Sequence, residues 1–354
     1  MKQFKSLAAI GAGLCALGLA AGGSAAADTN PGNTTTYAAV GSDTTQDVME
    51  SLSGVVLSTT GAPLLSNYMA TPTGTQITTN TGNANCTFDR PANSGQGRDA
   101  LSAAMRGVAF GHSAGSIAGC VNVARSSSNG NPTTSPGVGS MTYIPFATDA
   151  VTYAVQASSL VPKRLGKADL VAIYSANTPN CVLLPLLPTI GSGTREFFLG
   201  QLGFTNNKGA IGSVGGPGTC VKDTTAFGGA IQEHDGRFLS DPSNLIPFSV
   251  AQDVAQGSDA IANQLGSAAL GAIDATSDPN LANAKTATVL RGDFPFARPV
   301  YNVVPTAKLT SDAAFAGVFS GPQSKICLAG STIEKLGFAQ RLTDCGDTTF
   351  KNNN

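Results

Sequence analysis

Two segments rich in glycine and hydroxyl-bearing residues each lead into a predicted helix. In the first, an apolar strand that begins at Tyr37 runs through Gly41 and Ser42 into a polar turn. The apolar residues that follow recur at helical spacing: Val48, Met49, Leu52, Val55 and Val56. We therefore expect a helix to begin near Asp43 or Thr44. A turn of this kind presents free N–H groups and hydroxyls at the positive end of a helix, which suits an anion.

Ordinary helix capping is the alternative interpretation of this first segment. Asp43 is followed three residues later by Gln46, and this spacing fits a capping box. Under that interpretation the polar turn only satisfies the first amides of the helix and binds nothing.

The second segment repeats the arrangement about 150 residues later in the chain. Gly191-Ser-Gly-Thr precedes an apolar helix that carries Phe197, Phe198 and Leu202. Glycine lets a backbone approach a ligand closely, Ser192 and Thr194 add donors, and Arg195 adds a fixed positive charge. The spacing and the lysine of a nucleotide-binding P-loop are both missing. The two turns are expected to face one another across a cleft.

A third motif suggests a different class of protein. Gly111-His-Ser-Ala-Gly115 matches the G-x-S-x-G turn that exposes the nucleophile of serine hydrolases. Such an enzyme also needs a histidine later in the chain, and only His234 is available. A secreted serine hydrolase that uses Ser113 and His234 is therefore an alternative hypothesis. The leading interpretation assigns no catalytic residue.

Neither a metal ion nor a cofactor is expected. His112 and His234 are isolated from one another and are interpreted as hydrogen-bonded structural residues. Apart from Cys15, the chain has six cysteines, none at CxxC spacing: Cys86, Cys120, Cys181, Cys220, Cys327 and Cys345. An even number in an exported chain predicts three structural disulfides. Six cysteines allow 15 connectivities, of which pairing of sequence neighbours would close three separate loops.

The N-terminus has the pattern of an export signal. Lys2 and Lys5 are followed by an uncharged stretch from Leu7 to Ala21, and Ala25 to Ala27 supplies small residues for signal peptidase. We expect cleavage after Ala27 and a mature protein outside the cytoplasm, secreted or periplasmic. An uncleaved membrane anchor and lipidation at Cys15 are the alternatives. Leu14 is larger than the residue that usually precedes a lipidated cysteine.

The charge of the chain excludes some partners. The 354 residues include 21 Lys and Arg against 22 Asp and Glu, so the formal net charge is -1, and only 12% of residues are charged. Such a chain lacks the basic surface that attracts nucleic acid or an acidic membrane. An anion site here has to be built from amides, hydroxyls and helix ends, with one or two arginines.

The elements that must position these turns alternate along the chain. Strand-like and helix-like apolar segments follow one another to the C-terminus, and this pattern is typical of α/β layering. Several segments then resemble, in order, the phosphate-binding proteins of ABC transporters, and most of all a secreted actinobacterial-type branch. These segments are 40–45 (Val-Gly-Ser-Asp-Thr-Thr), 90–95 (Arg-Pro-Ala-Asn-Ser-Gly), 123–128 (Val-Ala-Arg-Ser-Ser-Ser), 143–151, 169–174, 190–195 (Ile-Gly-Ser-Gly-Thr-Arg) and 294–301.

The resemblance implies an α/β fold of the type II periplasmic-binding-protein kind. It has two lobes, two hinge crossings near Phe146 and Tyr301, and a mixed sheet in each lobe. The implied organisation is a signal peptide at 1–27, a first lobe at 28–146 with a C-terminal return at 298–354, and a second lobe at 147–297.

The resemblance also implies a set of ligand-binding residues. In chain order these are Thr44, Thr45, Ser94, Arg125, Ser126, Ser127, Ser192, Gly193, Thr194 and Arg195. Two positions depart from the family pattern. Ser127 stands where the family usually has Asp, so we expect a loss of anion selectivity, because a hydroxyl can both donate and accept. Pro188 stands where the family has Arg, and Arg125 or Arg195 is the candidate to restore the charge.

These observations predict a binding protein without catalytic chemistry. The implied function is capture of inorganic phosphate or a similar oxyanion between the lobes by a monomer, which presents its closed form to an ABC permease. A third hypothesis is an extracellular surface protein that keeps the fold with a degenerate ligand site, as Ser127 and Pro188 suggest.

Overall fold

The computed structural model describes residues 28–129, 139–225, 228–276, 281–286 and 289–352. The predicted signal peptide and Cys15 lie outside these residues. No helix in the described ranges has the length and apolar character needed to cross a membrane.

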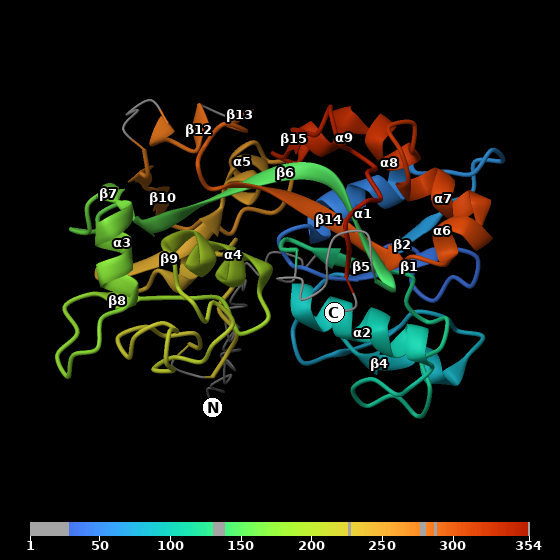
Figure 1. The fold of residues 1–354 in the computed structure, drawn as a ribbon, viewed down its shortest axis with the longest axis horizontal. Coiled ribbons are helices and arrows are strands. Elements are labelled where there is room, and N and C mark those ends of the chain that lie inside the picture. Colours follow the sequence, from blue (N-terminus) through green and yellow to red (C-terminus); the bar gives the residue numbers. More distant parts are fainter. Residues whose placement is uncertain (1–27, 130–138, 226–227, 277–280, 287–288, 353–354) are drawn as a thin grey trace, which may run out of the picture.

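The chain forms a mixed α/β structure around one large sheet (Figure 1). The central order is β2-β1-β5-β14-β6-β9-β8, and three further strands, β10, β15 and β16, also pair with β6. These strands are β1 (Tyr37–Gly41), β2 (Leu65–Asn67), β5 (Val123–Ser126), β6 (Met141–Gln156), β8 (Leu184–Pro185), β9 (Asn244–Ser249), β10 (Ala268–Leu270), β14 (Ala297–Pro305), β15 (Ala339–Gln340) and β16 (Lys351–Asn352). The predicted α/β fold class is confirmed.

Helices and short hairpins cover this sheet. The helices are α1 (Gln46–Val55), α2 (Ser94–Arg106), α3 (Lys167–Tyr174), α4 (Gly193–Leu202), α5 (Val250–Gly257), α6 (Lys308–Ser311), α7 (Ala313–Phe319), α8 (Lys325–Leu328) and α9 (Gly330–Lys335), with 3-10 turns η1 (Ala84–Cys86) and η2 (Gly236–Phe238). The remaining strands are β3 (Gln76–Thr78), β4 (Thr87–Asp89), β7 (Arg164–Gly166), β11 (Ala272–Asp274), β12 (Lys285–Thr286) and β13 (Val289–Leu290).

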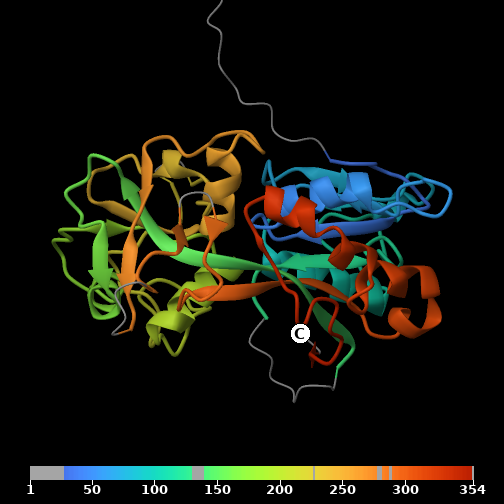
Figure 2. The same cartoon turned by 90° about the horizontal axis from the view of Figure 1, so that it is seen from above.

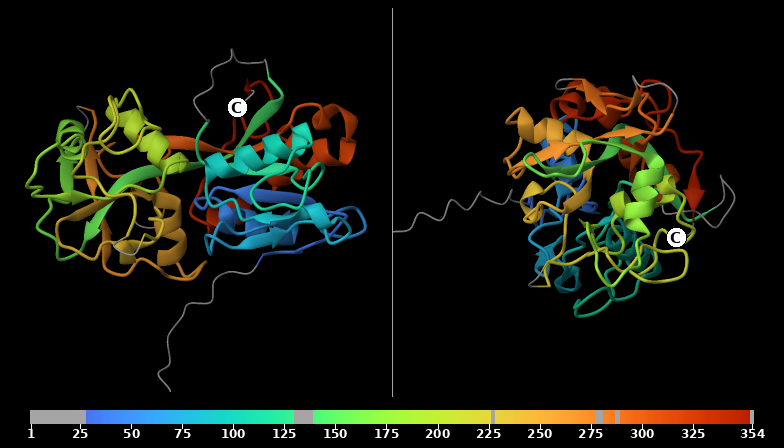
Figure 3. Two further views of the ribbon diagram at one scale, coloured as in Figure 1. Left: turned by 90° about the horizontal axis from the view of Figure 1, so that it is seen from below. Right: turned by 90° about the vertical axis from the view of Figure 1, so that its left-hand side faces the viewer.

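The molecule has two lobes, and among the described residues only strands β6 and β14 run from one lobe into the other (Figure 2). The first lobe holds β1 to β5, α1 and α2, together with α6 to α9, β15 and β16 from the C-terminal end. The second lobe holds β7 to β13 and α3 to α5. In Figure 3 the red C-terminal helices again lie beside the blue and cyan elements of the first lobe. The resemblance implied a mixed sheet in each lobe. In the structure these form one continuous sheet, because β6 pairs with strands of both lobes.

The sheet of the first lobe explains how its turns come together. Strands β2, β1 and β5 are parallel, so the carboxyl ends of β1 and β5 meet at the same edge. The helix after β1 starts at that edge. Helix α2 packs closely on β1, because Gly97 of α2 and Gly41 of β1 face each other and neither has a side chain. A Cβ on Gly97 would lie 2.6 Å from the Gly41 Cα.

Strand β6 is buried along nearly its whole length. Every residue from Met141 to Val155 is buried, and only Gln156 is partly exposed. Its apolar residues continue one core from the first lobe, with Leu52 of α1, into the second, with Phe198 of α4. Four polar residues, Thr142, Thr148, Asp149 and Thr152, are buried within this strand among its apolar residues.

The first predicted helix begins later than expected. Helix α1 starts at Gln46, and its N-cap residue is Thr45, which makes no side-chain capping bond. The Gln46 side chain accepts a hydrogen bond from the Ala70 amide instead of closing a capping box with Asp43. The capping-box alternative is wrong, because a contact outside the helix binds the residue that would close it.

Three disulfides are present, as predicted. They join Cys86 to Cys120, Cys181 to Cys220 and Cys327 to Cys345. Each pair joins sequence neighbours, so each disulfide closes a loop within one lobe. The first and third lie in the first lobe, and the second lies in the second lobe.

Candidate functional site: a hydroxyl cluster between the lobes

Three helix N-termini meet at the boundary between the lobes. Thr44 precedes α1, Ser94 is the first residue of α2, and Ser192 is the N-cap residue of α4. Each terminus offers unsatisfied amides and the positive end of a helix dipole. The three helices contain 10, 13 and 10 residues, and α4 faces α1 and α2 from the opposite lobe.

Five buried hydroxyl-bearing side chains converge at this point. They are Thr44, Ser94, Ser127, Ser192 and Thr194, each at most 2% exposed, and we call them the hydroxyl cluster. The Thr44 Oγ1 lies 3.3 Å from the Ser127 Oγ and 3.2 Å from the Thr194 Oγ1. The Ser94 Oγ lies 3.3 Å from the Ser127 Oγ, and the Ser127 amide donates to it at 3.1 Å. Both predicted turns therefore supply hydroxyls to one place.

Direct contacts join the two lobes around the cluster. The Gly95 amide donates to the Gly191 carbonyl at 2.9 Å. The Gln252 side-chain amide of α5 donates to the Thr44 carbonyl at 2.9 Å. Gly193 is essential to this approach, because a Cβ there would lie 2.5 Å from the Ser127 Oγ and 2.7 Å from the Ser94 Oγ.

A carboxylate of the protein itself occupies the centre of the cluster. Glu233, in the loop before η2, is fully buried. Its Oε1 accepts hydrogen bonds from the Thr194 hydroxyl, at 2.8 Å, and from the Thr44 hydroxyl. Its Oε2 lies 3.5 Å from the Ser192 Oγ. The hydroxyl cluster thus binds a negatively charged oxygen group with donors from both lobes.

A second buried carboxyl group lies beside Glu233. Burial raises the pKa of Asp43 well above its usual value of 3.8, and the charge of Glu233 and a hydrogen bond with its side chain raise this pKa further. The raised pKa favours the protonated form of Asp43, which can donate a hydrogen bond to the Glu233 side chain. The His234 Nδ1 lies 3.8 Å from the Asp43 carboxyl.

Arg298 of β14 supplies a positive charge next to the cluster. Its Nη2 donates to the Thr194 Oγ1 at 2.7 Å and to the Asp149 carboxylate of β6 at 2.9 Å. Among the described residues its Nε and Nη1 have no hydrogen-bond partner, although the side chain is buried. Arg298 and Ser127 also line a cavity of 240 Å³ beside the cluster.

The two arginines suggested by sequence point elsewhere. Arg125 donates to the carbonyls of Ser42, Ala39 and Gly41 and to the Asn67 side chain, and burial lowers its pKa to about 10. It therefore remains charged and stabilises the end of β1.

Arg195 is fully buried. It donates to the carbonyls of Pro188 and Gly209, and it forms an ion pair with Asp223 at 2.8 Å. These bonds direct its guanidinium away from the hydroxyl cluster.

The other predicted residues lie at the margin of the cluster. The Ser126 hydroxyl donates to the Ser128 carbonyl and accepts from Arg98. The Thr45 Oγ1 is buried and has no partner among the described residues. Gly193 has no side chain, which lets the start of α4 lie close to Ser94 and Ser127.

The structure does not support the serine hydrolase alternative. Ser113 lies in a loop between α2 and β5, whereas a nucleophile turn joins a strand to a helix. Its hydroxyl donates to the Gly115 carbonyl and accepts from the Phe110 amide. His234 is elsewhere, packed against Asp43 at the lobe boundary.

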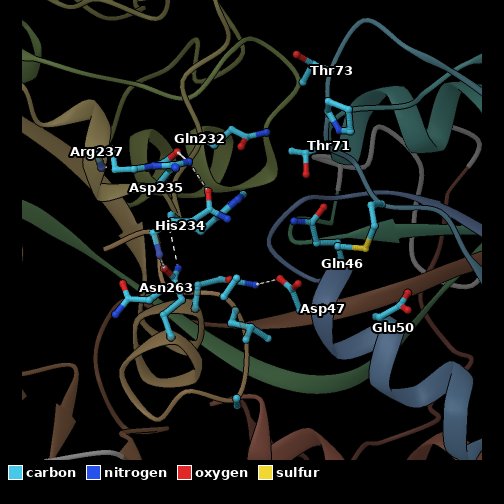
Figure 4. A pocket seen from close by; sticks show the side chains of 18 of the residues that line it. Gln46, Asp47, Glu50, Thr71, Thr73, Gln232, His234, Asp235, Arg237 and Asn263 are labelled. Carbon is cyan, nitrogen blue, oxygen red and sulfur yellow. Dashed lines mark hydrogen bonds and ion pairs between the residues drawn. The ribbon is translucent and has the colours of Figure 1, made fainter. Parts of the chain in front are cut away.

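An open groove of 790 Å³ lies on the α1 side of the cluster (Figure 4). Asp47 and Glu50 of α1 line its first-lobe wall. The second-lobe wall includes Gln232 and His234, the two neighbours of Glu233. In the described ranges no group of three or more His, Cys, Asp or Glu side chains is arranged to hold a metal ion.

Glu233, Arg298 and Asp149 were not predicted as site residues. Asp149 and Arg298 lie in the segments 143–151 and 294–301 that carry the family resemblance, and Glu233 is the neighbour of His234. A charged residue inside an otherwise buried strand was the available signal for Arg298 and Asp149. Glu233 gave no comparable signal because it lies in a loop.

The fold and the site together define a two-lobe α/β protein with a buried hydroxyl cluster where the lobes meet. No protein-family model matches the chain, and no curated protein matches it. Solved structures resemble it at low sequence identity. One is a phosphate ABC transporter substrate-binding protein from Clostridium perfringens with bound phosphate, with TM-score 0.47, 13% identity and coverage of 86% of this chain and 99% of that one.

Two further structures give similar values. An ABC-type phosphate transport receptor from Vibrio cholerae has TM-score 0.48 and 12% identity, and the match covers 86% of this chain and 100% of that one. A phosphate-binding protein from Stenotrophomonas maltophilia has TM-score 0.45 and 12% identity, with coverage of 88% and 91%.

Proposed function

We propose that this protein captures an oxyanion, phosphate in the first place, in the hydroxyl cluster between its two lobes. The observation that carries the proposal is the buried cluster itself, in which hydroxyls from both lobes hold the Glu233 carboxylate at the ends of three helices. An arrangement that binds one carboxylate has the donors that a tetrahedral oxyanion requires.

In this proposal Arg298 is the charged donor of the site. It already donates to Thr194, and two of its nitrogen atoms, Nε and Nη1, have no partner among the described residues. Charge-assisted hydrogen bonds from a buried guanidinium are roughly twice as strong as neutral ones. In this proposal Arg298 supplies the positive charge for which the sequence suggested Arg125 or Arg195.

The proposed mechanism is binding by lobe closure. In the open form water solvates the hydroxyls and helix ends, and closure about β6 and β14 replaces that water with the anion. Inside the closed site each hydrogen bond to the anion strengthens because the local dielectric constant falls. The proposed lobes are 28–146 with 298–354, and 147–297.

The proposed setting is outside the cytoplasm, after cleavage of the signal peptide at Ala27. The protein acts there as a monomer that delivers its ligand to an ABC permease. Three disulfides are compatible with an oxidising compartment.

A thermal-shift panel tests this function. Phosphate and arsenate are expected to raise the Tm of the protein in a concentration-dependent manner, because a ligand that binds only the folded state stabilises it. Sulfate is the comparison anion for selectivity. If none of the three anions raises the Tm, the surface-protein hypothesis with a degenerate site replaces this proposal.

A further inference from the structure

Glu233 uses the same donors that a captured oxyanion needs. The hydroxyls of Thr44 and Thr194 each have one proton, and both protons are directed at the Glu233 carboxylate. A carboxylate only accepts hydrogen bonds, so it adds no donor for a second anion. The cluster cannot serve Glu233 and an external anion at the same time.

The cluster also has no space for both groups. Its hydroxyl oxygens lie 3.2 to 3.3 Å apart in the pairs Thr44–Thr194, Thr44–Ser127 and Ser94–Ser127. Gly193 already touches two of these hydroxyls across the lobe boundary. A tetrahedral ion can therefore enter only if the lobes part and the Glu233 carboxylate leaves.

We propose that Glu233 is an internal anion of the hydroxyl cluster, that an incoming oxyanion displaces it, and that the displaced Glu233–Asp43 pair takes up a proton. This inference rests on the proposed function. It assigns Glu233 the role of a competing group that sets the affinity of the site and links it to pH.

The charges around the site are the reason why the Glu233–Asp43 pair takes up a proton when an oxyanion binds. Four buried carboxyl groups face the site: Asp43 before α1, Glu233 before η2, Asp149 of β6 and Glu196 of α4. The buried arginines are Arg98 of α2, Arg125 of β5, Arg195 of α4, which pairs with Asp223, and Arg298 of β14. Arg98 lies 3.7 Å from Glu196, Arg298 pairs with Asp149, and Arg125 is engaged by carbonyl groups.

Glu233 is held instead by the hydroxyls of Thr44, Thr194 and Ser192. A charged carboxylate next to a bound oxyanion repels it, and this repulsion is stronger in a buried site than in water. Protonation of the pair removes this repulsion. Binding is therefore expected to strengthen as the pH falls, since the bound state holds more protons than the free state.

The adjacent groove offers a place for the displaced side chain. Gln232 and His234 line this groove on either side of Glu233 (Figure 4). The groove has a volume of 790 Å³, which accommodates a glutamate side chain. The His234 Nδ1 is buried and has no hydrogen-bond partner among the described residues, so it is available to a carboxyl group that moves out.

The test is a calorimetric titration of wild type and Glu233→Gln with phosphate at about pH 6 and about pH 8. We expect Glu233→Gln to bind about tenfold more tightly than wild type at the higher pH, with a smaller gain at the lower pH, since one proton changes affinity at most about tenfold per pH unit. Glu50→Gln is the matched control, because Glu50 carries the same charge on the groove side of α1 and contacts Asn67 instead of the cluster. It is expected to bind like wild type.

A second measurement needs no variant. Wild type titrated with phosphate at fixed pH in two buffers of different ionisation enthalpy is expected to take up more protons than the ion itself accounts for. Sulfate, which remains a dianion over this range, isolates the protons taken up by the protein if it binds.

The outcomes separate the two proposals. Tighter binding by Glu233→Gln with excess proton uptake by wild type supports the inference. If wild type binds phosphate without excess proton uptake and Glu233→Gln gains nothing, the internal-anion role is overturned and the proposed function stands. If no oxyanion binds either protein, both proposals fail.

Discussion

At the scale of single residues, the candidate site includes one arginine from a strand that crosses between the lobes. Arg298 is 104 residues from Thr194 in sequence, yet it donates to the Thr194 hydroxyl at 2.7 Å. Its other partner, Asp149, is held in turn by the Ser249 hydroxyl and the Ala251 amide. The guanidinium is thus fixed in position before any ligand arrives.

Replacing Arg298 tests its role. We expect Arg298→Met to weaken phosphate binding by about tenfold to a hundredfold, because a hydrogen bond to a charged group contributes about 1.5–3 kcal/mol. Calorimetry measures the affinity. Arg298→Lys keeps the charge and is expected to lose less. If both variants bind phosphate as wild type does, Arg298 has no part in the site.

Asp43 predicts a dependence of stability on pH. Its pKa in the folded protein is raised by burial and by Glu233, so between 3.8 and that higher pKa the folded state holds a proton that the unfolded state releases. The free energy of unfolding should therefore fall as the pH rises through this window. In Asp43→Asn the fall should be smaller, as measured by urea unfolding at several pH values. An equal fall in both proteins would contradict this account.

The sequence predicted the hydroxyl-bearing residues of the cluster better than the charged residues beside it. Thr44, Ser192 and Thr194 belong to local turn signals that can be recognised without the fold, whereas Ser94 and Ser127 were implied by the family resemblance. The local sequence does not show which way the side chain of a buried arginine points. Arg125 and Arg298 are both fully or nearly fully buried, and only the fold shows which one faces the cluster.

At the scale of elements, the approach of α4 to the first lobe depends on a glycine. Gly193 begins α4 and lies against Ser94 and Ser127 of the other lobe. The contact is possible only because the residue lacks a Cβ. Closure of the two lobes at the cluster is therefore sensitive to a single methyl group.

Gly193→Ala tests this closure. Its Cβ would lie 2.5 Å from the Ser127 Oγ, so the lobes must stay further apart, at a cost of about 1–3 kcal/mol. We expect phosphate affinity to fall by about fivefold to a hundredfold. Gly54→Ala in α1 is the control, because a Cβ there meets nothing within 4 Å. Unchanged affinity in Gly193→Ala would show that the lobes need not close this tightly.

Element types were largely predictable, whereas their limits were not. The strand at Tyr37–Gly41 and the helix at Gly193–Leu202 follow the expected patterns. Helix α1 begins two residues after Thr44, because the Gln46 side chain bonds to Ala70 in a contact that local sequence does not encode.

At the scale of the whole molecule, the two lobes share one sheet, and none of the disulfides among the described residues joins one lobe to the other. Strands β6 and β14 pair from Met141 and Pro305 through Ala150 and Ala297. All three disulfides lie within a lobe. The covalent cross-links therefore stabilise each lobe without tying one lobe to the other.

Removal of one disulfide tests this separation of roles. Cys181→Ala with Cys220→Ala opens a loop with a sequence separation of 39. We expect the free energy of unfolding to fall by about 3–4 kcal/mol in urea unfolding. Phosphate affinity of the folded variant is expected to stay within about twofold of wild type, because the bond does not touch the cluster. A large loss of affinity without loss of stability would contradict this expectation.

The central claim is that hydroxyls from both lobes hold one oxyanion. Equilibrium dialysis of the purified protein against radiolabelled phosphate tests it most directly, with Thr44→Val and Thr194→Val combined as the variant, since valine keeps the shape and removes the hydroxyl. The account predicts one phosphate per wild-type molecule and none retained by the variant. Wild type that retains no phosphate, or a variant that retains as much as wild type, would contradict it.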